Sequence, residues 1–167
     1  MTRFAITFVL AAAIPFGNAV AADDAQQPAA TEFKVHPIGL VKKADNRTLI
    51  VLDKQYQPGL LGLEGFSHVL VFWWFDKNDT PEGRSVLQVH PKGNPQNPLT
   101  GVFATRSPRR PNLIALTLCK VVSVKDNAVE IDKTDAFDGT PVLDIKPFLP
   151  GYDTADDAKV PGWAKSN

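Results

Sequence analysis

The hydrophobic and polar positions in the middle of the chain follow the two-residue period of β-strands, and no stretch of ten or more residues shows a convincing helical repeat. Residues 67–75, SHVLVFWWF, form a continuous apolar and aromatic run, which predicts a central strand covered on both faces. In residues 114–124 the apolar side chains fall on even positions, which predicts a strand with that side buried: Ile114, Leu116, Leu118, Val122 and Val124.

The remaining strand predictions complete an all-β fold. Asp126 and Asn127 interrupt the alternating pattern, so residues 121–132 are expected to form a hairpin. Further strands are expected over residues 33–41, 47–53, 85–90, 101–105 and 142–145. Seven or eight short strands without a sustained helix favour a single closed or nearly closed β-barrel, because closure removes exposed strand edges.

The first residues have the pattern of a signal peptide. Arg3 precedes an apolar run of 11 residues, 4–14, and the small-residue pattern Ala19-Val20-Ala21 follows. That run is shorter than the roughly 20 residues that a transmembrane helix requires, so a retained anchor is the weaker alternative. We therefore expect residues 1–21 to be a signal peptide cleaved near Ala21, and the protein to be periplasmic or secreted, with no membrane span in the mature form.

The mature chain has the length of one domain. Residues 22–32 are rich in Ala, Gln and Asp and are expected to form a flexible leader, because they offer little apolar surface to bury. Residues 33–153 are expected to form the barrel, and residues 154–167 a polar tail. Trp163 in that tail is free to pack on the barrel or to remain exposed.

Charge and cysteine content narrow the classes of function. The whole chain has 18 Lys and Arg against 18 Asp and Glu, and one of the basic residues lies in the signal segment. Bulk charge therefore predicts no general attraction for nucleic acid, and any basic surface must be local. Cys119 is the single cysteine and lies in an apolar stretch, so it is expected to be a buried small side chain.

The densest group of basic residues lies between residues 90 and 112. Lys92, Arg106, Arg109 and Arg110 stand among prolines and glycines that restrict the backbone. A stiff loop of this kind can direct guanidinium groups at a carboxylate or a phosphate. The alternative is a solvated run of charges; three arginines within five residues favour a ligand site.

Two other polar segments have simple structural explanations. Residues 138–141, DGTP, are typical of a turn, and Asp144 and Lys146 share one face of the following strand, where an ion pair is as plausible as a catalytic role.

A lone histidine such as His68 is most often structural. The three histidines have no metal-binding spacing, so we predict no metal site. The glycine-rich and nucleophile motifs of Rossmann, P-loop and α/β-hydrolase proteins are missing.

Four motifs, in order, resemble the TsaA-like, TrmO-type family. They are residues 65–68 (GFSH), 90–94 (HPKGN), 101–112 (GVFATRSPRRPN) and 138–147 (DGTPVLDIKP). The resemblance spans residues 33–153. It implies a β-barrel that binds S-adenosylmethionine without a Rossmann domain, and methylation of N6 of threonylcarbamoyladenosine, or a similar adenosine-like acceptor, in tRNA. It also implies a homodimer with the methyl-donor site near the subunit interface.

The resemblance implies roles for individual residues. Cofactor-binding positions are matched by Ser67, His68, Lys92, Arg106, Asp138, Gly139, Thr140 and Pro141. Arg109, Arg110 and Lys146 are assigned to phosphate or carboxylate groups of the acceptor. No catalytic residue is assigned, because displacement at an activated methyl group depends mainly on positioning and exclusion of water.

The chain also departs from the family pattern. Leu113 and Ala115 replace a proline and a glycine, and Asp76 stands where histidine is common. These changes and the signal peptide support an alternative function, an exported and non-catalytic module that binds a nucleotide-like or anionic small molecule. A third hypothesis is an exported structural protein whose pocket is vestigial.

Overall fold

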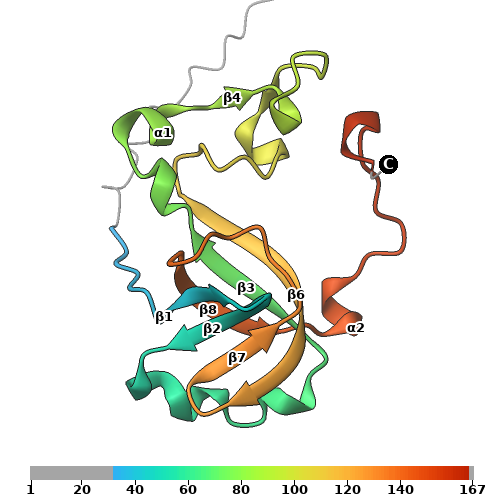
Figure 1. Cartoon of the computed structure of the whole chain (residues 1–167). Helices are drawn as coiled ribbons and strands as arrows, with labels where there is room; N and C mark the ends of the chain where they lie inside the picture. Colours follow the sequence, from blue (N-terminus) through green and yellow to red (C-terminus); the bar gives the residue numbers. More distant parts are fainter. Residues whose placement is uncertain (1–31, 166–167) are drawn as a thin grey trace, which may run out of the picture. The chain divides into compact units, whose positions relative to one another are not determined.

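The computed structural model describes residues 32–165, and the predicted signal peptide and most of the predicted leader lie outside this range. Six antiparallel strands close a barrel in the order β1-β2-β7-β6-β3-β8, with β8 pairing back to β1 (Figure 1). Their bounds are β1 Gly39–Ala44, β2 Arg47–Leu52, β3 His68–Trp74, β6 Ile114–Lys125, β7 Ala128–Ile131 and β8 Pro141–Pro147. The prediction of an all-β, closed barrel is confirmed.

The remaining elements are short. Strands β4 Gln88–Val89 and β5 Thr100–Gly101 pair with each other in a separate two-stranded sheet. The α-helices are α1 Pro81–Ser85 and α2 Pro150–Asp153, and short 3-10 helices connect several strands. Thr80 caps α1 by accepting a hydrogen bond from the Gly83 amide at 3.0 Å, and Pro81 occupies the first turn, where a missing N–H costs nothing.

Two tight turns set the register of the barrel hairpins. Asp45 and Asn46 join β1 to β2 with φ angles of 50° and 60°, the left-handed conformation that a two-residue hairpin turn requires. Asp126 adopts a φ of 53° between β6 and β7, so the predicted hairpin is confirmed. At Gly39 a Cβ atom would collide with the Val51 carbonyl, so the close approach of β1 and β2 requires glycine there.

The core fills the barrel with side chains from alternate positions of each strand. The buried set is Val41, Ile50, Leu52, Leu60, Val69, Val71, Trp73, Cys119, Val129, Ile131 and Val142. On β3 only the odd positions are buried, and His68, Leu70, Phe72 and Trp74 are partly exposed. The expectation that this strand is covered on both faces is therefore wrong, because its second face lies outside a barrel that has one interior.

Three other strand predictions need correction. Residues 33–38 precede β1 without strand structure, and the strand continues to Ala44 instead of ending at Val41. Only Gln88–Val89 of residues 85–90 and only Gly101 of residues 101–105 are in strands, and Val102–Ala104 form a 3-10 helix. Residues 85–90 and 101–105 belong to an insertion between β3 and β6, where hydrogen bonds within the loops replace pairing with a barrel strand.

Candidate functional site

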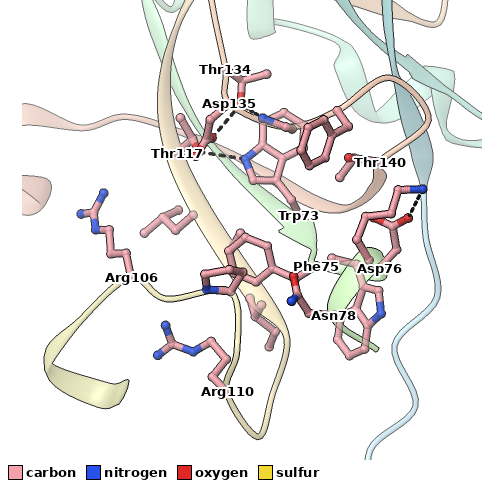
Figure 2. Close-up of a pocket in the computed structure, with 18 of the residues that line it drawn as sticks. Trp73, Phe75, Asp76, Asn78, Arg106, Arg110, Thr117, Thr134, Asp135 and Thr140 are labelled. Atoms are coloured by element: carbon pink, nitrogen blue, oxygen red, sulfur yellow. Dashed lines mark hydrogen bonds and ion pairs between the residues drawn. The ribbon is translucent and has the colours of Figure 1, made fainter. Parts of the chain in front are cut away.

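A cavity of about 1040 Å³ opens beside the end of β3 and the start of β6. This volume is in the range of pockets that hold a small organic ligand. Four segments line it: residues 73–78 after β3, the arginine loop with Thr105, Arg106, Pro108 and Arg110, residues 114–118 of β6, and the β7–β8 loop with residues 133–137 and Thr140 (Figure 2).

The indole of Trp73 forms an anchored part of the cavity wall. Trp73 is 2% exposed, pairs with Ala115 across the β3–β6 ladder, and donates a hydrogen bond from Nε1 to Thr117 Oγ1 at 3.0 Å. Figure 2 shows this bond beside the cavity. Because Trp73 fills the barrel interior here, the opposing residues of β6 must be small.

This packing reverses the predicted orientation of β6. The odd positions Ala115, Thr117 and Cys119 are half-buried or buried, whereas Ile114, Leu116 and Leu118 are exposed and line the cavity. Val122 is also exposed, whereas Val124, beyond an irregularity in the β6–β7 pairing, packs against the core as predicted. The prediction placed the side of the strand with the larger apolar residues inside the barrel. The side with the smaller residues faces the interior instead, because Trp73 of the neighbouring β3 fills that space.

Two arginines line one side of the cavity (Figure 2). Arg106 is exposed and Arg110 is half-buried, and Arg110 Nη1 donates a hydrogen bond to the Thr105 carbonyl at 3.3 Å. The loop is shaped by successive side-chain contacts, in which the Thr105 hydroxyl accepts from the Ser107 amide and the Ser107 hydroxyl accepts from the Arg109 amide. Within the described residues neither Arg106 nor Arg110 forms an ion pair with a carboxylate.

Carboxylates complete the polar lining. Asp135 lies in the β7–β8 loop, where its Oδ1 accepts a long hydrogen bond from Thr134 at 3.4 Å. Asp76 is half-buried and lies 3.3 Å from the Lys77 ammonium group. The cavity therefore presents cationic groups, carboxylates and an apolar wall to the same volume.

A clamp of charged groups holds the end of β3 to the inserted loops. Asp79 accepts hydrogen bonds from Arg84 Nε at 2.8 Å and from Trp74 Nε1 at 3.0 Å, and these bonds lower the pKa of Asp79. The Arg84 guanidinium also lies 5.2 Å from the Trp74 ring centroid and donates to the Pro111 carbonyl. The clamp therefore connects a cavity-lining tryptophan with the end of the arginine loop.

The DGTP turn is held against β1 by two hydrogen bonds. Asp138 Oδ1 accepts a hydrogen bond from the Lys43 amide at 2.9 Å, and the Gly139 amide donates to the Val41 carbonyl at 2.8 Å. Gly139 has a φ of 80°, which favours glycine. Thr140 is buried and lines the cavity, and Pro141 begins β8 opposite Leu40. Of this motif, only Thr140 lines the cavity.

Only some of the other cofactor residues expected from the resemblance line the cavity. Arg106 lines the cavity, but Ser67 and His68 lie at the opposite end of β3. At about 3.3 Å per strand residue, His68 is roughly 20 Å from the cavity end of β3. The Ser67 hydroxyl lies 2.9 Å from His68 Nδ1, and the His68 ring packs edge-on against Phe148. Lys92 is exposed in the inserted loops, outside the cavity, with a left-handed φ of 59°.

The acceptor residues expected from the resemblance are also divided. Arg110 lines the cavity, whereas Arg109 is exposed outside it. Lys146 lies on β8 and forms an ion pair with Asp144 at 2.9 Å, as the spacing of these two residues suggested. Arg106, Arg110 and Thr140 are therefore the expected site residues that one cavity brings together.

Several cavity residues have no role in the sequence-based assignment. They are Trp73, Trp74, Phe75, Asn78, Asp135 and Phe137, together with the exposed apolar residues of β6. Phe137 is 66% exposed although it is a large aromatic residue. The sequence signal that could have identified this wall is the set of large apolar residues at alternate positions of β6, because these side chains do not fit an interior that Trp73 already occupies.

Neither a metal site nor a membrane-spanning helix is found in residues 32–165. No group of three or more His, Cys, Asp or Glu side chains there is arranged to hold a metal ion. No helix in the described part of the chain has the length and apolar character needed to cross a bilayer.

The sequence is similar to a known family of protein domains. Residues 29–154 match the family described as the tRNA-methyltransferase O N-terminal domain. A probable S-adenosyl-L-methionine-binding protein of Pyrococcus horikoshii is 48% identical over 121 residues, which are 72% of this chain and 86% of that protein. The tRNA (adenine(37)-N6)-methyltransferase of Mus musculus is 46% identical over 104 residues, 62% of this chain and 23% of the mouse protein.

Solved structures show the same fold. A crystal structure of TrmO has a TM-score of 0.64 at 29% identity, covering 81% of this chain and 66% of that one. TrmO from Pseudomonas aeruginosa has a TM-score of 0.60 at 27% identity, covering 77% and 62%. The chain thus spans somewhat less than two thirds of these TrmO chains and under a quarter of the mouse enzyme.

Proposed function

We propose, since this chain belongs to the family of the tRNA-methyltransferase O N-terminal domain, that it is an S-adenosylmethionine-dependent methyltransferase acting on N6 of an adenine. The proposed acceptor is threonylcarbamoyladenosine in tRNA or a similar adenosine-like group. The observation that carries the proposal is a single cavity in which Arg106 and Arg110 face an apolar wall and carboxylates.

The cavity residues fit the chemical groups of S-adenosylmethionine. Its carboxylate suits a guanidinium, its ammonium and sulfonium groups suit a carboxylate such as Asp135, and its adenine suits the aromatic surfaces of Trp74 and Phe137. The volume of about 1040 Å³ leaves room for part of an acceptor beside the donor. When bound, this cofactor supplies an electrophilic methyl group on sulfur.

Under this proposal the residues of the chain bind, orient and exclude water. Arg106 holds the donor carboxylate, and Arg110, on the same loop, pairs with the carboxylate that a threonylcarbamoyl group carries. Ile114, Leu116 and Leu118 cover the apolar side and keep water from the reacting atoms. Orientation and exclusion of water are the main requirements of methyl transfer.

A proton must leave the acceptor nitrogen when its new bond to carbon forms. Asp76 and Asp135 are the carboxylates that line the cavity, so one of their oxygens is the proposed acceptor of that proton. Asp76 stands where histidine is common in the family. Asp76→Asn and Asp135→Asn variants should separate the two, because only the proton acceptor should lose turnover while keeping cofactor affinity.

Methyl transfer is tested with purified protein, labelled S-adenosylmethionine and tRNA that contains threonylcarbamoyladenosine. We expect label at adenine N6 with wild-type protein and strongly reduced transfer with Arg106→Ala. Lys125→Ala is the matched control, because Lys125 is an exposed cation at the far end of β6. Transfer unaffected by Arg106→Ala would contradict the assignment of the cavity.

We also propose that the protein acts as a homodimer. The expected cofactor residue His68 does not line the cavity that contains Arg106 and lies about 20 Å along β3 from Trp74, which favours two half-sites joined across protomers. A two-fold axis gives each protomer the same contact, so both sites would be completed together.

Subunit complementation tests this arrangement. A His68→Ala chain and an Arg106→Ala chain should each bind the cofactor weakly, and mixed, re-equilibrated dimers should regain one intact site. Equilibrium sedimentation measures the assembly independently. A monomer at working concentration, or no recovery in mixed dimers, would refute the shared site.

An exported binding module is the second candidate function. It is supported by the signal-peptide pattern of residues 1–21 and by departures from the family pattern at Leu113 and Ala115. Leu113 is fully buried, and Ala115 lies opposite Trp73 beside the cavity. Ligand binding without methyl transfer, with the protein found in the periplasmic or extracellular fraction, would favour this function; cytoplasmic protein with turnover would favour the enzyme.

A further inference from the structure

The insertion between β3 and β6 has an unusual distribution of charge. From Gly83 to Lys125 the sequence has seven Lys and Arg residues and no Asp or Glu. From Asp126 to the end it has nine acidic and four basic residues. We define residues 86–112, which include β4 and β5, as the basic lobe. The basic lobe therefore has four Lys and Arg residues and no carboxylate to balance them.

The cations of the basic lobe are available to an external anion. Lys92, Arg106 and Arg109 are exposed, Arg110 is half-buried, and none of the four lies in an ion pair in the described part of the chain. Outside the lobe, Arg47, Lys77, Arg84 and Lys146 have carboxylate partners, whereas exposed lysines such as Lys54 and Lys125 form no ion pair with the described residues. The lobe thus keeps its charge unneutralised.

Large apolar side chains are exposed on the same lobe. Leu87 is 60% exposed, Leu99 57% and Phe103 77%. Leu87 and Val102 are joined by a backbone hydrogen bond next to the β4–β5 pair, and Phe103 follows in the 3-10 helix that leads to Arg106. An exposed aromatic ring three residues from a free guanidinium is suited to stacking on a nucleobase whose phosphate is bound nearby.

We infer that the basic lobe holds single-stranded RNA that flanks the acceptor base. Arg106 and Arg110 belong both to the lobe and to the cavity wall, Arg109 is exposed on the same loop, and Lys92 is exposed in the same lobe. Phosphates bind these outer cations, and Phe103 stacks on an unpaired base. The inference rests on the proposed function, because it names the surface by which that site reaches its RNA.

The test measures binding of a fluorescein-labelled RNA hairpin with an unpaired loop, by anisotropy, over a series of salt concentrations. Lys92→Gln/Arg109→Gln should weaken binding and lower the slope of log K against log salt by about 1.4, since each single-strand phosphate contact contributes about 0.7. Phe103→Ala should weaken binding roughly tenfold with little change in that slope. The fully paired duplex of the same length should bind less tightly than the hairpin.

Matched controls are Lys54→Gln/Lys125→Gln, which removes two exposed cations outside the lobe, and Tyr152→Ala, which removes an aromatic residue that is 87% exposed on α2. Both should bind the hairpin as wild type does. Three results would overturn the inference: lobe variants that bind the hairpin like wild type, a wild-type protein that binds no RNA, and lobe variants that change only the state of association.

Calorimetry with S-adenosylmethionine separates this inference from the proposed function. The Phe103→Ala variant should keep wild-type cofactor affinity, because Phe103 does not line the cavity and is not among the expected cofactor-binding residues. RNA binding through the lobe without cofactor binding would refute the proposed function and leave the lobe assignment standing. Cofactor binding, together with RNA binding that is unaffected by the lobe variants, would refute the lobe assignment and leave the proposed function standing.

Discussion

The hydrogen bond between Trp73 and Thr117 should be a main stabilising contact of the cavity wall. Thr117→Val keeps the shape of the side chain but removes the acceptor for the indole N–H. Because Trp73 is 2% exposed, its Nε1 would then be left without water or a protein partner. Thr117→Ser keeps the acceptor and removes one methyl group.

The expected magnitudes follow from burial. An unsatisfied buried donor costs about 1–3 kcal/mol, so Thr117→Val should lower the free energy of unfolding by that amount. Thr117→Ser should cost about 0.8 kcal/mol or less, since the threonine methyl is only partly buried. In the Trp73→Phe background the donor is already missing, so adding Thr117→Val should cost much less than it does in the wild type.

Urea unfolding of the four proteins gives the double-mutant cycle. A coupling energy of about 1–2 kcal/mol between Trp73 and Thr117 is expected, with unchanged dependence on urea. A coupling energy near zero would refute the reasoning. So would a Thr117→Ser variant as unstable as Thr117→Val, because the two differ in the acceptor.

Three further predictions concern single side chains. Burial raises the pKa of the Cys119 thiol to about 12, so this thiol should resist alkylation in the folded protein at pH 8; a native protein labelled as fast as the unfolded chain would contradict this. Since the unfolded thiol ionises near pH 9, stability should fall as the pH rises from 9 toward 12, and Cys119→Ala should remove that part of the decline in urea titrations. The hydrogen bonds from Arg84 and Trp74 lower the pKa of Asp79, so the stabilising effect of this carboxylate should be present at neutral pH and be lost as the pH falls through its lowered folded-state pKa. Asp79→Asn should therefore make the free energy of unfolding less dependent on pH in the acid range. An unchanged pH dependence in that range would show that the clamp has no such effect. Lys146→Ala should change the free energy of unfolding by less than about 1 kcal/mol, because its ion pair is exposed; a loss of several kcal/mol would contradict that estimate.

The barrel could be predicted because its signals are local. Strand alternation, the Asp126 turn and the absence of helical periodicity each depend on neighbouring residues, and they led to the correct fold class. The orientation of β6 could not be obtained this way. The burial of Ala115 and Thr117 depends on Trp73, which lies more than 40 residues away in the sequence and fills the same space.

The site was predictable only in part. The density of arginines pointed to Arg106 and Arg110, which do line the cavity. Trp74 and Phe137 could not be assigned, because their place in the cavity depends on how the insertion and the β7–β8 loop fold back on β6. The separation of His68 from the other end of β3 likewise follows from the direction of that strand in the barrel.

The central claim is that the cavity beside Arg106 binds S-adenosylmethionine, and thermal unfolding with and without excess cofactor tests it most directly. At a hundredfold excess over the dissociation constant, binding should add about 2.7 kcal/mol to the stability of the wild-type protein. The Arg106→Ala variant should show a much smaller shift at the same cofactor concentration, and Lys125→Ala an unchanged one. No shift in the wild type, or an equal shift in Arg106→Ala, would contradict the account.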